Sequence, residues 1–180
     1  KFMHTKRIFI AFATSKEVKN QLEGVSGELI KLNKKAHVRW VEPEKMHVTV
    51  QFLGELIDER VEQVKVVLSK VVGEHEKFSY WLNGLDAFPN KSNPNIIIAK
   101  VGEEHRRSFL FQEDVVAGLR DVGIIGDEKP WTPHVTIGRN KRHEKIVGFD
   151  TFDGFNRKKH KFDNVRIFHK LFKKNKINSK

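Results

Sequence analysis

The chain has 180 residues, enough for one domain with a sizeable core, and its 38% hydrophobic residues, 14 Phe and 3 Trp among them, indicate a folded globule. It contains no cysteine, which excludes disulfides and thiolate metal sites. No apolar run approaches the roughly 18 residues of a membrane-spanning helix and no signal-peptide core opens the chain, so a cytoplasmic protein without a membrane partner is expected. The formal net charge of +11 favours polyanionic partners, although a generally lysine-rich chain would carry the same charge.

The first half of the chain alternates between strand and helix patterns. Residues 6–13, KRIFIAFA, are apolar almost throughout and predict a strand that is covered on both faces. Apolar residues then recur at the spacing of one stripe of an amphipathic helix, at positions 18, 22, 25, 29 and 32. HVRWV at residues 37–41 predicts a short strand, residues 45–53 a longer one, and residues 58–72 a second helix.

The second half has a similar order of patterns. Residues 78–88 and 95–101 predict two strands, joined by a loop at residues 89–94 that is rich in Pro and Asn. A third helix is predicted at residues 103–122, followed by a loop and a further strand. A last strand is predicted at residues 162–172.

No linker or low-complexity segment divides the chain, so we expect one domain over residues 1–180. Residues 1–5 precede the patterned chain and are interpreted as a remnant of an added segment. Residues 173–180 are interpreted as a frayed basic tail.

Two short segments share the pattern His-x-Thr followed by an apolar residue. They are MHVTVQFLG at residues 46–54 and PHVTIGR at residues 133–139, and both lie in strand-like runs. Successive side chains of a strand point to opposite faces, so residues i and i+2 share one face. His47 and Thr49 therefore project together, as do His134 and Thr136, while the apolar residues between them turn toward the core.

The motif pair resembles the twin His-x-Thr-x signature of the 2H phosphoesterases. In the contexts KMHVTVQFLGE and PHVTIGR it is most similar to the RNA 2′,3′-cyclic phosphodiesterase branch, also called the 2′–5′ RNA ligases or LigT-like proteins. The resemblance extends over nearly the whole chain, from the opening RIFIAF strand to the spacing of the motifs. It implies an α+β fold in which two pseudo-symmetric lobes of antiparallel β-sheet, flanked by helices, surround a central active-site cleft. It also implies a monomer that needs no cofactor.

The chemistry implied by this resemblance suits the residue types. A 2′,3′-cyclic phosphate opens by in-line attack on phosphorus, and two imidazoles with pKa values near neutrality can act as acid and base. His47 and His134 are the candidates for these roles, and the hydroxyls of Thr49 and Thr136 are candidate donors to the non-bridging oxygens. Arg139 matches the Arg that follows the second motif in this branch and is the candidate phosphate-binding cation.

Arg139 lies three residues after Thr136, so strict alternation would place it on the opposite face of the strand. A β-bulge or a strand end at Gly138 would re-aim it toward the motif face. The sequence is compatible with both orientations.

By the resemblance, His47 protonates the departing 3′ oxygen and His134 activates water, which leaves a 2′-phosphate. The residues alone leave the reverse assignment open. If the 5′-hydroxyl of a second RNA replaces water, the same site joins ends through a 2′–5′ linkage without ATP. A metal-independent mechanism is expected, because no cysteine exists and no carboxylate stands at a ligand-like spacing from either histidine.

Phe9 and Phe12 are further candidates, as stacking surfaces for an RNA base, with core packing as the alternative for each. Basic clusters at residues 139–145, 157–161 and 173–176 could together form a basic rim around the cleft. Expected substrates are RNAs with 2′,3′-cyclic phosphate ends, with tRNA fragments as one source. Two alternatives stay open: a 2H enzyme for a small cyclic nucleotide, and a catalytically idle RNA-binding module.

Overall fold

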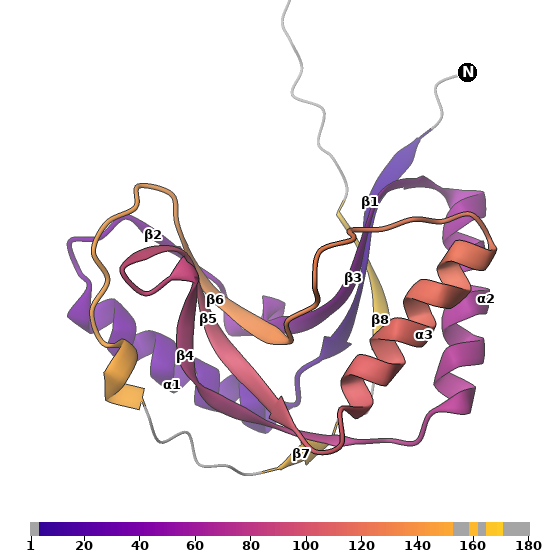
Figure 1. The fold of residues 1–180 in the computed structure, drawn as a ribbon. Coiled ribbons are helices and arrows are strands. Elements are labelled where there is room, and N and C mark those ends of the chain that lie inside the picture. The colour runs from indigo at the N-terminus through magenta and orange to yellow at the C-terminus, as the bar shows by residue number, and fades with distance from the viewer. Residues whose placement is uncertain (1–3, 153–158, 162–164, 171–180) are drawn as a thin grey trace, which may run out of the picture.

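A computed structural model describes residues 4–152, 159–161 and 165–170 of the protein (Figure 1). Its strands form one sheet, in which every pairing is antiparallel. Three α-helices and two short 3-10 helices accompany the eight strands within these ranges. The elements in chain order are β1 (Thr5–Ala13), α1 (Lys16–Leu32), β2 (Val38–Trp40), η1 (Pro43–Lys45), β3 (His47–Ile57), α2 (Asp58–Glu74), β4 (Ser79–Asn90), β5 (Asn93–Glu103), α3 (Arg107–Asp121), β6 (His134–Asn140), η2 (Phe149–Phe152), β7 (His160–Lys161) and β8 (Val165–Lys170).

The two motif strands lie at the centre of the sheet. The strand order is β7-β4-β5-β6-β3-β1-β8, and β2 pairs with β6 outside this path. β3 and β6 are bridged at a single residue pair, Val48 with Val135, and from this junction the two halves of the sheet diverge (Figure 1). Each half repeats the other, since β1 pairs with β3 as β5 pairs with β6, and β8 pairs with β1 as β4 pairs with β5.

One face of the sheet is covered by helices and forms the core. Val48 and Val135 are fully buried on this face, and the apolar stripe of α1 contributes Val18, Leu22 and Leu29, all fully buried. α2 and α3 pack side by side against the half that holds β3, while α1 lies under the other half (Figure 1). The opposite face of the sheet, here called the open face, carries the half-buried polar residues of the motifs.

The α+β fold with its antiparallel sheet is therefore confirmed, and most predicted elements are found with shifted ends. β1 begins at Thr5, whose hydroxyl donates to the Glu55 carboxylate at 3.1 Å. The predicted loop at 89–94 shrinks to a turn at residues 91–92, because β4 and β5 continue their pairing to Asn90 and Asn93.

Three other predictions change at their ends. α3 begins at Arg107 because the residues up to Glu103 pair in β5, and α2 continues to Glu74. The last predicted strand is β8, and the rest of its range, 162–164 and 171–172, lies outside the described residues, as does the tail at 173–180. In the described part of the chain no helix is long and apolar enough to cross a membrane.

Gly138 on β6 sits where β2 packs closely against it. A Cβ at this position would lie 2.9 Å from Val38 Cγ1 and 3.0 Å from Trp40 Cε3, closer than side chains tolerate. Gly138→Ala is therefore expected to lower the free energy of unfolding by about 1–3 kcal/mol, through overpacking that pushes β2 away.

Urea denaturation checks this expectation, with Gly24→Ala as the matched control. Gly24 lies inside α1, and a Cβ added there would meet nothing within 4 Å beyond its own stretch of helix, so the same substitution should stabilise the helix by about 0.5–1 kcal/mol. Equal effects at both glycines would contradict the packing argument.

Candidate active site

The single bridge between β3 and β6 brings the two motifs together. Because Val48 pairs with Val135, continuing the antiparallel register by one residue each way sets His47 opposite Thr136 and Thr49 opposite His134. Directly opposite residues of an antiparallel pair share a face, so all four side chains project from the open face. All four are half-buried, whereas the valines between them are fully buried.

The two histidines are held in the same way. Nδ1 of His47 lies 2.7 Å from the carbonyl oxygen of Lys45, and Nδ1 of His134 lies 2.7 Å from the carbonyl oxygen of Thr132. A carbonyl oxygen only accepts, so Nδ1 of each ring carries the proton and donates it. In both neutral rings Nε2 is consequently the nitrogen with the lone pair, available to take a proton or, once protonated, to give one.

Matched β-bulges follow the two motifs. The register of β3 on β1 shifts between Ile10 and Ala11, which leaves Val50 as the extra residue. The register of β6 on β5 shifts between Ile97 and Ile98, which leaves Ile137 as the extra residue, immediately before Gly138. A bulge inserts one residue and so moves later side chains to the other face.

The bulge in β6 decides the orientation of Arg139. Ile137 and Gly138 are both buried, so the alternation of buried and more exposed residues shifts by one position there. As a result, Arg139 is exposed on the same face as His134 and Thr136. Arg139 therefore lies on the motif face, as the bulge hypothesis required. The corresponding residue after the first motif is Phe52, whose side chain is 48% exposed.

The pKa of each imidazole is lowered, chiefly by burial, which disfavours the charged ring. The hydrogen bond from Nδ1 to a carbonyl acts in the opposite direction, and the positive charge of Arg139 lowers the pKa of both rings further. His134 also lowers the pKa of His47. Both rings are thus predominantly neutral near pH 7 in the free protein, and a bound anion between them would favour protonation of one.

Aromatic rings surround His47. Phe9 lies over its imidazole with the ring centroids 5.0 Å apart and an angle of 30° between the planes, and Phe168 stacks on Phe9 at 5.1 Å and 7°. Phe52 is tilted against Phe9 at 5.8 Å. The structure therefore places Phe9 on the open face beside the first motif.

Phe12 is not part of this group. Its side chain is 1% exposed and packs against Phe78 and Phe111 in the core, with ring centroids 5.6 Å and 5.2 Å away. The interpretation of Phe12 as a stacking surface for a base is therefore wrong, and the core alternative applies. The reason is the strand alternation, because residues 9 and 12 are three apart and face opposite sides of β1.

Two aromatic residues of the site were missed from the sequence. Phe88 on β4 lies edge-on to His134, with the centroids 5.0 Å apart, and Phe168 on β8 lies 5.5 Å from His47. Phe168 pairs with Phe9, and Phe88 pairs with Ile96, the β5 neighbour of Arg139, so the two rings occupy equivalent places in the two halves. Only the strand order brings these outer strands to the motifs, and no local pattern signals it.

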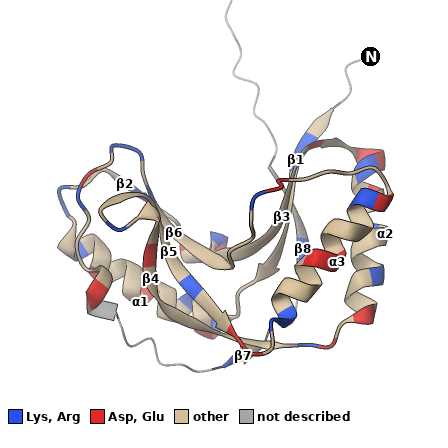
Figure 2. Ribbon diagram, in the orientation of Figure 1, with Lys and Arg blue, Asp and Glu red and all other residues tan. Residues whose placement is uncertain are grey.

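The basic residues gather unevenly around this face. Lysines and arginines colour the loops beside β2, at upper left in Figure 2, and exposed examples are Lys34, Lys35, Lys141 and Arg142. The cluster at 139–145 is thus adjacent to the site. Of the cluster at 157–161 only residues 159–161 are described, and the cluster at 173–176 lies outside the described residues.

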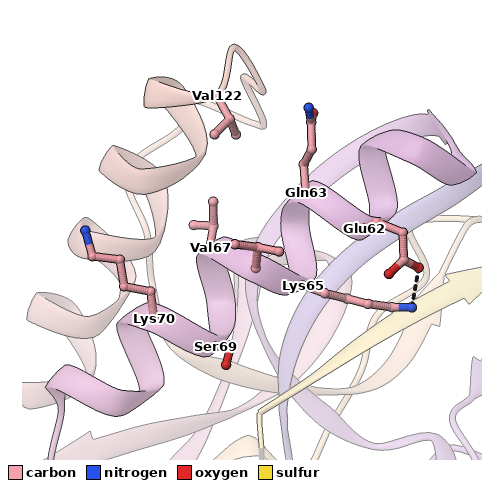
Figure 3. A pocket seen from close by; sticks show the side chains of 8 residues that line it. Glu62, Gln63, Lys65, Val67, Ser69, Lys70 and Val122 are labelled. Carbon is pink, nitrogen blue, oxygen red and sulfur yellow. Dashed lines mark hydrogen bonds and ion pairs between the residues drawn. The ribbon is translucent and has the colours of Figure 1, made fainter.

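A separate hollow of about 740 Å³ lies on α2, away from the motifs (Figure 3). It is lined by side chains of α2, including Val66 and Lys70, and by Val122 at the end of α3, and by no motif residue. The chemistry of the protein is therefore assigned to the open face, where the titratable groups converge.

The donor set of the site is imidazole, hydroxyl and guanidinium. Within residues 4–152, 159–161 and 165–170 no three histidine or carboxylate side chains are grouped so that they could hold a metal ion.

Comparison with known proteins gives the family. The family model described as LigT like Phosphoesterase matches residues 12–98. The RNA 2′,3′-cyclic phosphodiesterase of Archaeoglobus fulgidus is 32% identical over 141 residues, which are 78% of this chain and 76% of that protein. This chain belongs to the LigT-like phosphoesterase family. The RNA 2′,3′-cyclic phosphodiesterase of Thermotoga maritima is 33% identical over 145 residues, 78% of this chain and 75% of that protein.

The fold of this LigT-like protein is also that of a solved relative. The crystal structure of Escherichia coli LigT complexed with 3′-AMP superposes with a TM-score of 0.69 and 19% sequence identity, over 94% of this chain and 90% of that chain.

The charge of Arg139 provides a test of the site's electrostatics. Arg139→Ala should raise the pKa of both His47 and His134, because the removed cation disfavours each imidazolium. Both values should stay below the ordinary value of about 6.5, since burial is the larger cause and remains. Titration of the imidazole resonances by NMR measures the two values.

Lys70→Ala is the matched control, because it removes one positive charge from the exposed side of α2 and Lys70 is not among the charges that shift either imidazole. A shift of only one histidine in the Arg139 variant would contradict a guanidinium shared between the two rings.

Proposed function

We propose that the protein is an RNA 2′,3′-cyclic phosphodiesterase that opens the cyclic phosphate to a 2′-phosphate by acid–base catalysis with His47 and His134. The observation that carries the proposal is the equivalence of the two imidazoles. Each has its Nδ1–H fixed by a carbonyl, each has Nε2 available, and each stands opposite the threonine of the other motif. The names of the curated relatives agree with this substrate.

In the proposed reaction, a water oxygen attacks phosphorus in line with the departing 3′ oxygen. Nε2 of His134 takes the proton that the water loses, and the protonated Nε2 of His47 gives its proton to the 3′ oxygen as the P–O bond breaks. The reaction leaves a 2′-phosphate and a free 3′-hydroxyl, with His134 protonated and His47 neutral. Proton exchange with solvent then restores the starting state.

The neighbouring groups act on the charge that builds up at phosphorus. The hydroxyls of Thr49 and Thr136 would donate to the non-bridging oxygens, and the guanidinium of Arg139 would offset their negative charge. The negative charge of the bound phosphate would also raise the pKa of His47, which is lowered in the free protein, because a nearby negative charge favours the imidazolium that the acid role requires. The donors thus hold the phosphate where its charge favours the protonated form of His47, which acts as the acid. The donor set gives no reason to invoke a metal ion.

The proposal has four extensions. Because all four motif residues come from one chain, a monomer is sufficient for the chemistry. When a 5′-hydroxyl takes the place of water, the steps above join two RNA ends through a 2′–5′ linkage without ATP. RNAs with cyclic phosphate ends, such as tRNA fragments, would be the substrates. Phe9, on the strand next to that of His47, would stack on an RNA base.

The first test uses a short RNA that ends in a 2′,3′-cyclic phosphate, in excess EDTA. The wild-type protein should convert it to a 2′-phosphate end, and His47→Ala and His134→Ala should each lower kcat by about 10²–10⁴-fold, because each removes one proton-transfer group. Phosphatase sensitivity and assignment of the 2′ or 3′ position identify the product.

The matched control is His4→Ala, which removes an exposed histidine outside the site and should leave the rate unchanged. RNA that is bound but never opened would replace this proposal with an idle binding module. Opening of small cyclic nucleotides but not of RNA would replace it with a small-nucleotide enzyme.

The threonines provide a second test. Thr49→Val and Thr136→Val keep the branched shape on a strand and remove only the hydroxyl, so each should lower kcat by about 10²-fold while the thermal unfolding midpoint stays close to that of the wild type. Steady-state kinetics and circular dichroism measure the two quantities. Full activity in either variant would remove that hydroxyl from the mechanism.

A further inference from the structure

A second arginine faces Arg139 from the neighbouring strand. In the pairing of β2 with β6, Arg39 stands directly opposite Arg139, and Trp40 stands opposite Gly138. Directly opposite residues lie about 4.5–5.5 Å apart at Cα and point to the same face. Arg39 and Arg139 are both exposed, so the two guanidinium groups extend side by side from the open face.

Like charges directly opposite each other destabilise an antiparallel pair. Within the described ranges neither guanidinium group has a hydrogen bond or an ion pair that would offset this cost. Arg39 lowers the pKa of the Glu42 carboxyl, but Lys45 lowers it more, and Lys45 Nζ lies 2.6 Å from a Glu42 carboxylate oxygen. An anion between the two arginines would remove the repulsion.

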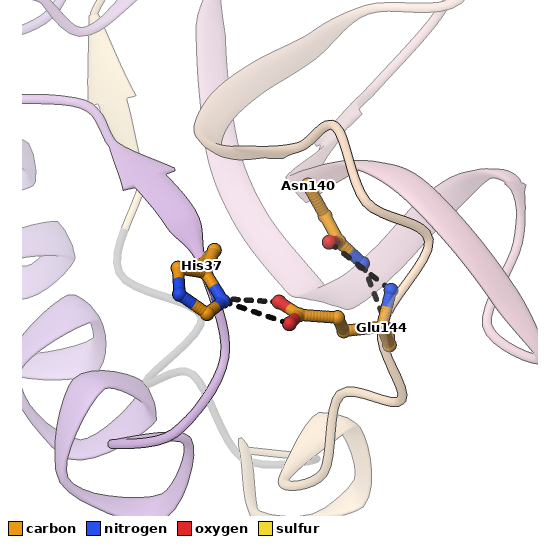
Figure 4. Close-up of polar contacts among 3 residues, drawn as sticks. All are labelled: His37, Asn140 and Glu144. Carbon is orange, nitrogen blue, oxygen red and sulfur yellow. Dashed lines mark hydrogen bonds and ion pairs between the residues drawn. The ribbon is translucent and has the colours of Figure 1, made fainter.

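The fold fixes Arg39 in this place from both ends of β2. Figure 4 shows His37, just before β2, bonded to the carboxylate of Glu144 in the loop after β6, with an Nδ1 to Oε1 distance of 2.9 Å. The backbone N–H of His37 also donates to this carboxylate. Asn140, which is fully buried, holds the same loop through its bonds with the backbone of Glu144. At the other end, the N–H of Val41 donates to the Ile137 carbonyl at 2.8 Å.

Arg39 lies on β2, one strand away from β6, which carries both Arg139 and His134. Neighbouring strands are about 4.8 Å apart, so a phosphate held by Arg39 would be displaced by roughly that distance from one held by Arg139. In agreement with this displacement, Arg139 lowers the pKa of both imidazoles and Arg39 is not among the charges that do so.

We propose that Arg39 binds the phosphodiester that precedes the terminal cyclic phosphate of the RNA, while Arg139 binds the cyclic phosphate itself. This assignment rests on the proposed function. A guanidinium presents a planar fork of donors that matches two phosphate oxygens, and an RNA end offers consecutive phosphates at neighbouring positions. Arg39 thus gives the protein a preference for a polymeric RNA end over a mononucleotide, which has no preceding phosphodiester.

The test compares two substrates that differ by one nucleotide, which brings the preceding phosphodiester with it. They are adenosine 2′,3′-cyclic phosphate and the dinucleotide ApA with a 2′,3′-cyclic phosphate end. Arg39→Ala should lower kcat/KM for the dinucleotide by about tenfold, the lower part of the range for a charged hydrogen bond, and change it less than about twofold for the mononucleotide. Arg39→Lys should restore part of the loss, because it keeps the charge but not the fork.

A third substrate locates the contact. In ApA with an uncharged methylphosphonate linkage and the same cyclic end, wild-type and Arg39→Ala proteins should have nearly equal kcat/KM, because the charged partner of Arg39 is absent. Lys70→Ala, which removes one positive charge from the exposed side of α2, is the control for a general loss of steering and should leave the ratio between the substrates unchanged.

The other outcomes would overturn the assignment. Equal losses on mononucleotide and dinucleotide would place Arg39 at the cyclic phosphate or in the fold, and unchanged kinetics on both would remove it from the site. A loss that persists with the methylphosphonate would exclude the preceding phosphodiester. Inactivity of the wild-type protein on both cyclic substrates would overturn the proposed function, and with it this role.

Discussion

The backbone bridge between Val48 and Val135 determines the geometry of the site. Each valine is the middle residue of a His-x-Thr motif, and each side chain is fully buried. Burial of both fixes which way the flanking residues point, because a slip of one residue would turn the histidines into the core and the valines out of it. One antiparallel pairing therefore orients four polar side chains.

The symmetry of this junction extends through the sheet. Both motif strands have a bulge at the same distance from the histidine, both histidines bond a carbonyl two residues earlier, and each ring has an aromatic neighbour from the outermost long strand of its half. The shared backbone geometry makes the histidines equivalent. The residues after the bulges, Phe52 and Arg139, are what make the two sides of the site different.

Much of this arrangement could be predicted from the sequence, because alternation along a strand is a local property. His47, Thr49, His134 and Thr136 follow from it directly, and Gly138 signalled the irregularity that brings Arg139 to the same face. Phe12 could have been excluded by the same rule applied to Phe9. Phe88, Phe168 and Arg39 could not have been placed, since they reach the site from strands whose neighbours depend on the order of the whole sheet.

The difference between Phe52 and Arg139 affects the direction in which an RNA strand, whose 5′ and 3′ ends differ, could lie across the sheet. A site with a true two-fold axis would accept such a chain equally well in either direction. Here one direction puts its anionic linkages along the guanidinium side, and the other puts them against the rings of Phe9, Phe52 and Phe168, which offer no compensating charge. Two halves that share their strand pairing thereby acquire a polarity, which under the proposed function is a reason for His47 and His134 to have different roles.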